Sequence, residues 1–433
     1  MYKKVLIISH NPITTYHAMG KTFLTMFSSF KEEELCQLYI YPTIPDIKKC
    51  SSYYRITDKD ILKSYFKFKV GGGEIDKSHI SESNNSMFEI AEDEQLYRNP
   101  KNKKPIMLLA RDLMWLFSGW FNKELKDWLT REKPTCIFVA PGKSKFLYNI
   151  ALKISKYLDI PIVTYICDEY YFVKTPKALS GKIQVKLLQK KIEKLMLKTS
   201  HIITICNSLK DLYSNRFNIP ATTVMTGSNT QIYEKVKSNK SRKVITYMGN
   251  IGYNRFLSLK DIGLAIDKFN SNYNTDIKLD IYTPTTNPDI LSHFDGINSI
   301  NLKGFVTGEE FIKTFNSAKL LLHTESFDKT NIELVKNSVS TKIADSLASG
   351  ICLLAYGPRE VASMRHLIDN DCALIATNKD ELEQMLYDAY FNDEKVYKCV
   401  ENALIAAKKY HSQKTNSEIV YKIMENINET SSS

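Results

Sequence analysis

Residues 320–358, LLLHTESFDKTNIELVKNSVSTKIADSLASGICLLAYGP, indicate most clearly how this chain folds. The apolar run at 320–322 predicts a strand that ends in a polar cluster at 323–326. Three hydroxyl-bearing residues within 338–341 precede Lys342 and predict the start of a short helix. A turn of small residues at 349–350 ends that helix, and a second apolar strand follows. Polar groups at the end of a strand, facing a helix start, are typical of an α/β sheet that binds a phosphate-bearing ligand.

The composition indicates a globular protein of two or more domains. The chain has 433 residues, of which 43% are hydrophobic and 25% charged. No apolar run approaches the roughly 20 residues that span a bilayer. The eight cysteines form no CxxC pair, so we expect buried reduced thiols and a cytoplasmic location. The net charge of +11 comes without a nucleic-acid motif, which excludes nucleic acid as the expected partner and favours an anionic membrane surface.

Apolar runs alternate with longer amphipathic stretches, which predicts an α/β protein with parallel sheets. The polar stretch at 234–242 has the composition of a linker, and a new strand with a glycine turn follows it. We therefore expect two Rossmann-like domains, at 1–236 and 243–408, followed by a polar C-terminal helix at about 409–433. The region 45–104 is expected to be an insertion. Predicted strands lie at 5–8, 37–41, 136–140, 161–167, 201–205, 244–248, 279–282, 320–323 and 351–355.

The opening stretch resembles the donor-sugar site of the GT-B glycosyltransferases, in particular the retaining family 4. That family places one acidic residue after a strand and a second in a helix that ends in small residues and glycine. Glu325 matches the first position, and Asp345, in DSLASG, matches the second. The family usually has seven residues between its two Glu residues, a spacing that Glu325 and Glu333 match literally, but Glu333 lacks the small-residue helix behind it. The STKIADSLASG form resembles enzymes of bacterial polysaccharides and cell-surface glycans.

The resemblance implies further donor-site residues. A glycine turn after a strand and a cation are expected to bind the diphosphate, because charge builds up on it as the glycosidic bond breaks. Arg255 is favoured over Lys260, which has the spacing of a solvated helical residue. The residues implied for the diphosphate are Gly20, Gly249, Asn250, Arg255, Ser340, Thr341 and Lys342, and those for the ribose and base are Asp345, Gly304, Phe305 and Val306. The alternative for 304–306 is a plain strand exit, capped by Thr307.

Two residues of the first domain are implied on the acceptor side. Asp168 follows an apolar strand, where a carboxylate could orient an acceptor hydroxyl or act as a base. The alternative for Asp168 is a helix N-cap. His17 lies on the loop after the first strand, with Gly20, and the alternative there is a polar connection with a cap glycine. Glu325 is expected to hold hydroxyls of the donor sugar.

Two other patterns resemble sites and have plainer interpretations. Residues 369–371 spell the DxD of metal-dependent glycosyltransferases, but they lie far beyond the donor loops, so we expect a surface turn and no metal. Residues 106–129 hold all three Trp residues and could lie on a membrane surface. A helix packed on the first sheet fits their apolar spacing better.

The resemblance as a whole implies a GT-B glycosyltransferase that moves a sugar from a nucleotide sugar, UDP-linked by preference, to a hydroxyl with retention. It needs no cofactor, and the expected acceptor is a glycan, lipid-linked or protein-linked precursor at the cytoplasmic face of the membrane. One alternative is a non-catalytic glycosyltransferase-like partner that binds a glycan or a protein. Another is a GT-B enzyme of a different reaction, such as epimerisation of a sugar nucleotide.

Overall fold

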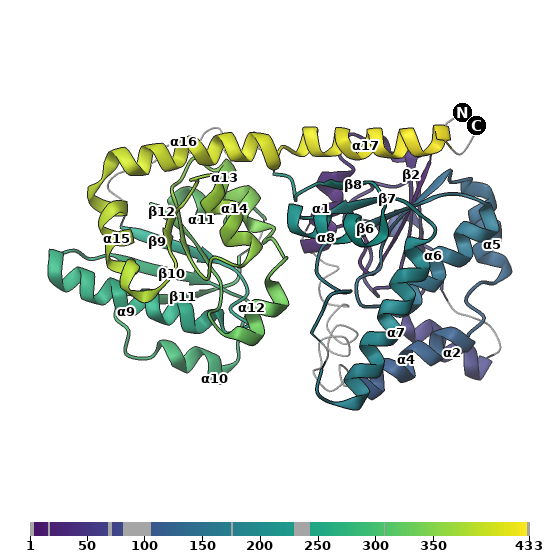
Figure 1. Ribbon diagram of the computed structural model, residues 1–433, viewed down its shortest axis with the longest axis horizontal. Helices are drawn as coiled ribbons and strands as arrows, with labels where there is room; N and C mark the ends of the chain where they lie inside the picture. The colour runs from purple at the N-terminus through teal and green to yellow at the C-terminus, as the bar shows by residue number, and fades with distance from the viewer. Residues whose placement is uncertain are drawn as a thin grey trace. The chain divides into compact units, whose positions relative to one another are not determined.

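A computed structural model describes residues 4–15, 18–67, 72–80, 105–174, 176–228, 243–306 and 308–430. The chain divides into two compact units (Figure 1). Unit 1 comprises Met1–Val224 and Lys414–Ser433, and unit 2 comprises Met225–Gln413. The predicted linker at 234–242 lies outside the described residues.

Unit 1 is built on a sheet whose described strands run in the order β4-β3-β2-β1-β5-β6-β7-β8. All neighbouring pairs are parallel except β3 with β4. Continuous burial of β1, with the sequence VLIIS, is typical of a parallel strand covered on both faces. The strands are β1 (Val5–Ser9), β2 (Leu35–Tyr39), β3 (Ser52–Arg55), β4 (Gly73–Glu74), β5 (Cys136–Ala140), β6 (Ile162–Ile166), β7 (Thr199–Thr204) and β8 (Ala221–Thr223).

Helices complete unit 1, and the C-terminal helix is one of them. Val420, Met424 and Ile427 of that helix belong to the apolar cluster formed by β1, β5 and the first helix. The helices are α1 (Ala18–Met26), α2 (Asp58–Lys67), α4 (Pro105–Phe117), α5 (Lys123–Glu132), α6 (Lys145–Leu158), α7 (Leu179–Met196), α8 (Asn207–Phe217) and α17 (Gln413–Thr430).

Unit 2 has a sheet whose described strands are all parallel, in the order β11-β10-β9-β12-β13-β14. This is the strand order of a Rossmann sheet, with its reversal between β9 and β12. The strands are β9 (Val244–Met248), β10 (Lys278–Tyr282), β11 (Ile300–Gly304), β12 (Leu320–Thr324), β13 (Leu353–Tyr356) and β14 (Leu374–Ala376). The helices are α9 (Arg255–Tyr273), α10 (Pro288–Leu291), α11 (Gly308–Ser317), α12 (Lys329–Val335), α13 (Lys342–Ala348), α14 (Ala362–Asp369), α15 (Leu382–Phe391) and α16 (Asp393–Tyr410).

The predicted α/β class with two parallel sheets is confirmed, and several details differ from the prediction. The described part of 45–104 is no insertion, because Ser52–Arg55 forms a strand of the sheet. The single helix expected at 106–129 is two helices, α4 and α5, because Asn122 caps a new start by accepting from the N–H of Leu125 at 2.9 Å. The strand expected at 351–355 begins two residues later, at Leu353.

Candidate functional site

The reversal of strand order between β9 and β12 sets the place of the site in unit 2. Loops leave two such neighbouring strands toward opposite faces of the sheet, so a crevice opens at their carboxyl ends. After β9 the chain passes through Tyr253 and Asn254, both with left-handed φ values, of 55° and 58°. Non-glycine residues adopt this conformation rarely, and such residues gather at functional sites. The turn ends at Arg255, which is the first residue of α9.

Arg255 binds the carboxylate of Glu325 through two of its nitrogens. Nε lies 2.9 Å and Nη2 lies 2.8 Å from Oε2 of Glu325. Glu325 directly follows β12 and is 2% exposed. Its backbone N–H donates to the carbonyl oxygen of Tyr356 on β13, and its own carbonyl oxygen accepts from the hydroxyl of Ser258. The carboxylate is therefore fixed in direction from both its backbone and its side chain.

The charges of this cluster act on one another. Burial raises the pKa of the Glu325 carboxyl, while Arg255 and Lys342 lower it in part. For Arg255, burial lowers the pKa, but Glu325 and Tyr247 together more than offset this, so the guanidinium stays charged. Burial, with Arg255 and Lys342, lowers the pKa of His323 to about 3. Its Nε2 lies 3.5 Å from Oε1 of Glu325 and has no hydrogen-bond partner among the described residues.

Lys342 joins this cluster from the start of α13. Its ammonium lies over Gly249, at the carboxyl end of β9, so close that a Cβ on residue 249 would collide with Nζ. The N–H of Gly249 donates to the carbonyl oxygen of Tyr282 at 2.8 Å and fixes the loop. Two cations and one carboxylate leave a net positive charge at the reversal point, which suits a doubly charged anion such as a diphosphate.

Asp345 lies on α13, one turn after Lys342, and is 4% exposed. Its Oδ1 accepts from the hydroxyl of Ser228 at 2.8 Å. The N–H of Ser228 in turn donates to the carbonyl oxygen of His411, and Nδ1 of His411 lies 2.9 Å from the carbonyl oxygen of Thr226. The predicted ribose carboxylate is thus fastened to the two segments at the ends of unit 2, near 226–228 and 411.

The other predicted donor residues take varied positions. The N–H of Ser340 donates to the hydroxyl of Ser363 at 3.1 Å. The expected hydroxyl cap of the helix at Lys342 is wrong, because the side chain of Thr341 makes no capping hydrogen bond. Asn250 accepts from the N–H of Gly252 at 2.6 Å and so shapes the turn after β9.

The loop predicted to hold the base follows the edge strand β11. Gly304 has a φ of 79°, which favours glycine, and the register with β10 shifts there. Phe305 is 63% exposed, whereas Val306 is buried. The alternative N-cap, Thr307, lies outside the described residues.

The sequence offered two alternative sites. Glu333 is in the middle of α12. Asp371 has a left-handed φ of 47° in the turn after α14 and pairs with Lys398 at 3.2 Å, which fits the expected surface turn. Within the described ranges, no group of three or more acidic, His or Cys side chains is arranged to hold a metal ion.

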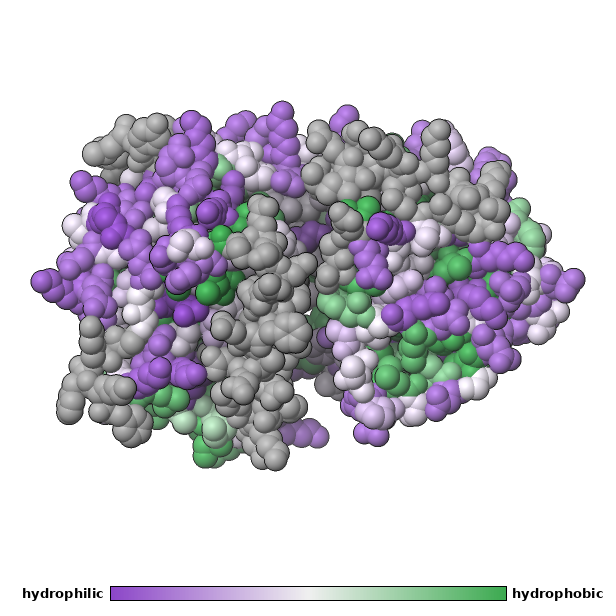
Figure 2. All heavy atoms as spheres, turned by 180° about the vertical axis from the view of Figure 1, so that it is seen from behind, coloured by the Kyte–Doolittle hydropathy of each residue, from purple (hydrophilic) through white to green (hydrophobic). Residues whose placement is uncertain are grey.

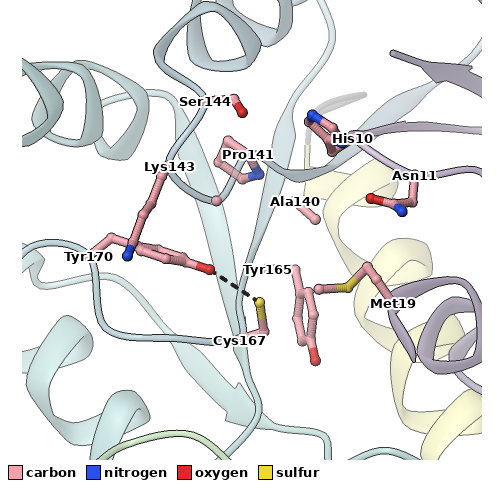
Figure 3. A pocket seen from close by; sticks show the side chains of 11 residues that line it. His10, Asn11, Met19, Ala140, Pro141, Lys143, Ser144, Tyr165, Cys167 and Tyr170 are labelled. Carbon is pink, nitrogen blue, oxygen red and sulfur yellow. Dashed lines mark hydrogen bonds between the residues drawn. The ribbon is translucent and has the colours of Figure 1, made fainter. Parts of the chain in front are cut away.

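Unit 1 has a pocket at its own reversal of strand order, between β1 and β5. Its volume is about 180 Å³, and Figure 3 shows His10 and Asn11 on one side with Lys143 and Tyr170 on the other. Burial, helped by Arg111, lowers the pKa of His10 to about 4, so the imidazole is neutral. The remaining lining residues are Met19, Ala140, Pro141, Gly142, Ser144, Tyr165 and Cys167.

The acceptor-side residues predicted from the sequence are found around this pocket in part. Asp168 accepts from the hydroxyl of Tyr170, a lining residue, at 3.0 Å. The alternative of a helix N-cap at Asp168 is wrong, because the next helix begins at Leu179. A Cβ at Gly20 would collide with Thr14, so this glycine allows the loop to pack on α1. His17 lies outside the described residues.

Solved structures with similar architecture cover nearly the whole chain. One is Anabaena Alr3699/HepE in complex with UDP, with a TM-score of 0.63 and 9% identity over 98% of this chain and 100% of that chain. The chain has the GT-B fold. Sucrose-phosphate synthase from Thermosynechococcus elongatus matches with a TM-score of 0.60 and 9% identity, over 98% and 99% of the two chains. A UDP-forming α,α-trehalose-phosphate synthase from Burkholderia xenovorans, in complex with glucose-6-phosphate, matches with a TM-score of 0.61 and 10% identity, over 98% of this chain and 100% of that chain.

No protein-family model matches the sequence, and no curated protein does. The GT-B likeness therefore concerns the fold, and the roles of the residues rest on the geometry. Sequence reasoning missed His10, Ser228 and His411, which owe their positions to contacts between distant segments. His10 had one signal, since it follows the first apolar strand directly. His323 was noted as polar but received no role.

Proposed function

We propose that this protein is a retaining glycosyltransferase of the family 4 type. It transfers a sugar from a nucleotide sugar, UDP-linked by preference, to a hydroxyl of a glycan, lipid-linked or protein-linked acceptor. The products fit the building of bacterial polysaccharide or cell-surface glycans, and the reaction needs no metal ion. The preference for UDP is supported by the similar Anabaena Alr3699/HepE structures, which are complexes with UDP and with UDP-glucose.

One observation carries the proposal. Arg255, Lys342 and Glu325 meet at the carboxyl ends of β9 and β12, where the strand order reverses. A guanidinium and an ammonium offer several charged donors to a diphosphate, and charge on that group grows in the transition state. Arg255 uses two of its nitrogens on Glu325 and retains further N–H donors for phosphate oxygens.

The reaction then proceeds with balanced bonds. The bond between the anomeric carbon and the diphosphate oxygen breaks, while the acceptor oxygen forms a new bond to that carbon from the same face. The acceptor proton passes to an oxygen of the departing diphosphate, which Arg255 and Lys342 stabilise. Glu325 accepts from hydroxyls of the donor sugar, and Asp345 holds the ribose. Ser340, Thr341, Gly249, Asn250 and Gly20 complete the diphosphate site, and Gly304, Phe305 and Val306 hold the base.

The acceptor side belongs to unit 1 in this proposal. The pocket beside His10 combines two tyrosine rings with polar groups, and such a lining suits the apolar face and the hydroxyls of a sugar. Asp168, held by Tyr170, orients the acceptor hydroxyl, and His17 is assigned to the same side. The eight free thiols suit a reducing compartment such as the cytoplasm, with peripheral contact to the membrane.

The testing experiment is calorimetric titration of UDP, GDP, dTDP and CMP into the wild type and two variants. Lys342→Ala should weaken the binding of whichever nucleoside diphosphate the wild type binds. The matched control is Lys379→Ala, because Lys379 is 71% exposed in the same unit and its ammonium pairs with Asp261. If none of the four nucleotides binds, the proposal is wrong.

A second measurement separates an enzyme from a non-catalytic partner. Glu325→Gln keeps the shape of the side chain and removes the charge assigned to the donor sugar. We expect it to bind the nucleotide and to release UDP from UDP-sugar and acceptor at least about 100-fold more slowly than the wild type. Nucleotide binding by the wild type without any sugar transfer would favour the non-catalytic alternative.

A further inference from the structure

Helix α4 of unit 1 has an inner face that is firmly held. Arg111 and Asp112 are its only charged residues within the described part, and both point inward to ion pairs. The indole of Trp115 is buried, and its Nε1 donates to Oδ1 of Asp58 at 2.6 Å. The pairs that hold the inner face are Arg111–Asp58 at 2.8 Å, Asp112–Lys145 at 2.6 Å and Trp115–Phe146 with ring centroids 4.4 Å apart.

The outer face of α4 is apolar and exposed. Ile106, Ala110, Leu113 and Phe117 are spaced by four, three and four residues, so they form one stripe along the helix. Ile106 is 71% exposed, Leu113 45% and Phe117 74%, and the neighbouring Leu116 is 57% exposed. An apolar stripe of this length on a helix that its inner face already anchors marks an interaction surface.

Helix α7, which packs against α4, adds positive charge. Its exposed positions Leu179, Lys182, Ile183, Lys186 and Lys190 form a second stripe, apolar at the start and basic further along. Between 172 and 192 the sequence has six lysines and no acidic residue. Figure 2 shows apolar side chains gathered at the lower left of the molecule, at the end of unit 1 where α4 and the start of α7 lie in Figure 1.

We propose that these two stripes, the α4–α7 surface, dock unit 1 on an anionic phospholipid bilayer. The inference deepens the proposed function and rests on it in one respect: an enzyme with a lipid-linked acceptor meets it at such a surface. The apolar stripe of α4 enters the boundary between headgroups and acyl chains, as an in-plane amphipathic helix does. The lysines of α7 stay at the level of the headgroups.

Charge complementarity favours a lipid surface as the occupant. A row of lysines on flexible stems, without an acidic residue or a fixed hydrogen-bonding pattern between them, suits a laterally mobile array of negative headgroups. Each Lys near such a surface contributes about 1 kcal/mol, which corresponds to roughly a fivefold gain in partitioning. The net charge of the chain, +11, acts in the same direction.

The test is flotation of the full chain with two kinds of vesicle, one of equal parts phosphatidylglycerol and phosphatidylcholine and one of phosphatidylcholine alone. The wild type should bind the vesicles that contain phosphatidylglycerol and should not bind those of phosphatidylcholine alone. Added salt should weaken the binding. Lys182→Glu with Lys186→Glu should weaken partitioning at least about 20-fold, because two favourable charges become repulsive. Leu113→Glu with Phe117→Glu should weaken it at least about tenfold through lost apolar burial.

The control variant makes the same kinds of change on another exposed helix. Ile405→Glu with Lys408→Glu on α16 alters one exposed apolar residue, 60% exposed, and one exposed lysine, and it should bind vesicles as the wild type does. The inference is overturned if the wild type ignores the anionic vesicles, or if all three variants bind equally. A wild-type dimer that the α4 variant dissociates would also overturn it, since a second copy would then be the occupant.

The two proposals fail separately. UDP calorimetry on the same samples should give one affinity for the wild type and all three variants, because none of these residues belongs to the donor cluster. Vesicle binding without UDP binding would retain the α4–α7 surface and reject the donor site. UDP binding without vesicle binding would retain the donor site and reject the α4–α7 surface as a membrane-docking site.

Discussion

Replacement of Gly249 by Ala tests the donor cluster from its backbone side. The Cβ of the new residue would occupy the present position of Lys342 Nζ, so the ammonium must move. Gly249 is not among the glycines with a left-handed φ, and therefore alanine fits its backbone without strain. The end of a lysine side chain yields easily, so we expect the fold to persist while the ammonium leaves the site.

The size of the effect follows from what the ammonium does in the proposal. A charged hydrogen bond to a buried or half-buried partner is worth about 1.5–3 kcal/mol. Displacement of Lys342 should therefore weaken UDP binding about 10- to 150-fold. Isothermal calorimetry measures this directly, and urea unfolding of both proteins checks that the free energy of unfolding is unchanged.

A double-mutant cycle shows whether the effect passes through Lys342. If it does, Gly249→Ala should cost nothing further once Lys342 is alanine, because the ammonium is already gone. Gly73→Ala is the control, since a Cβ there meets nothing within 4 Å. Unchanged UDP affinity in Gly249→Ala, or losses that add in the double variant, would refute the reasoning. Additive losses would point to Tyr247, whose hydroxyl lies 3.3 Å from the same Cβ.

Three further predictions concern stability. Ser228→Ala removes the donor to the buried carboxylate of Asp345 and should lower the free energy of unfolding of unit 2 by about 1–3 kcal/mol in urea titrations; an unchanged midpoint would contradict it. Burial lowers the pKa of His366 to about 3 and that of His411 to about 4. The neutral imidazoles therefore contribute fully to the free energy of unfolding above about pH 6.5, the pKa in the unfolded chain, and this contribution is lost as the pH falls toward 4. His366→Gln should therefore make stability fall less steeply in that window, by about 1.4 kcal/mol per pH unit, and an equal slope in urea titrations would reject this. Trp115→Ala should lower the free energy of unfolding by about 3–5 kcal/mol, and Trp115→Phe should lower it clearly less, because Phe retains the ring stacking on Phe146. Equal losses of stability in thermal unfolding of the two variants would contradict the assigned packing.

The features that the sequence predicted well are those set by neighbours in the chain. The strands at 136–140 and 244–248 are found with the predicted bounds, because short apolar runs between polar turns form buried parallel strands. The start of α13 at Lys342 and the glycine turn at Gly249 were also visible, since each needs only a few adjacent residues. Lys342 and Gly249 meet because of the strand order, and a parallel α/β sheet has few alternative strand orders.

The features that the sequence did not predict depend on distant partners. Ser228 and His411 are far apart in the chain, yet they pair beside Asp345 through bonds that no local pattern encodes. The break between α4 and α5 depends on the cap at Asn122, which competes with an apolar spacing that continues through it. Strand β3 was overlooked because the four residues SYYR lie in a polar region, and pairing with β2 makes them a strand.

The two reversal points explain why the proposed donor and acceptor sites differ in chemistry. Both lie at carboxyl ends of parallel strands, where polar loops converge for the same geometric reason. In unit 2 the converging side chains are Arg255, Lys342 and Glu325, a charged group that suits a phosphorylated ligand. In unit 1 they are mainly rings and neutral polar groups, with one lysine, Lys143, and with His10 kept uncharged by burial, which suits a sugar ring. Topology thus sets the place of each site, and the few side chains that reach it determine which ligand it can bind.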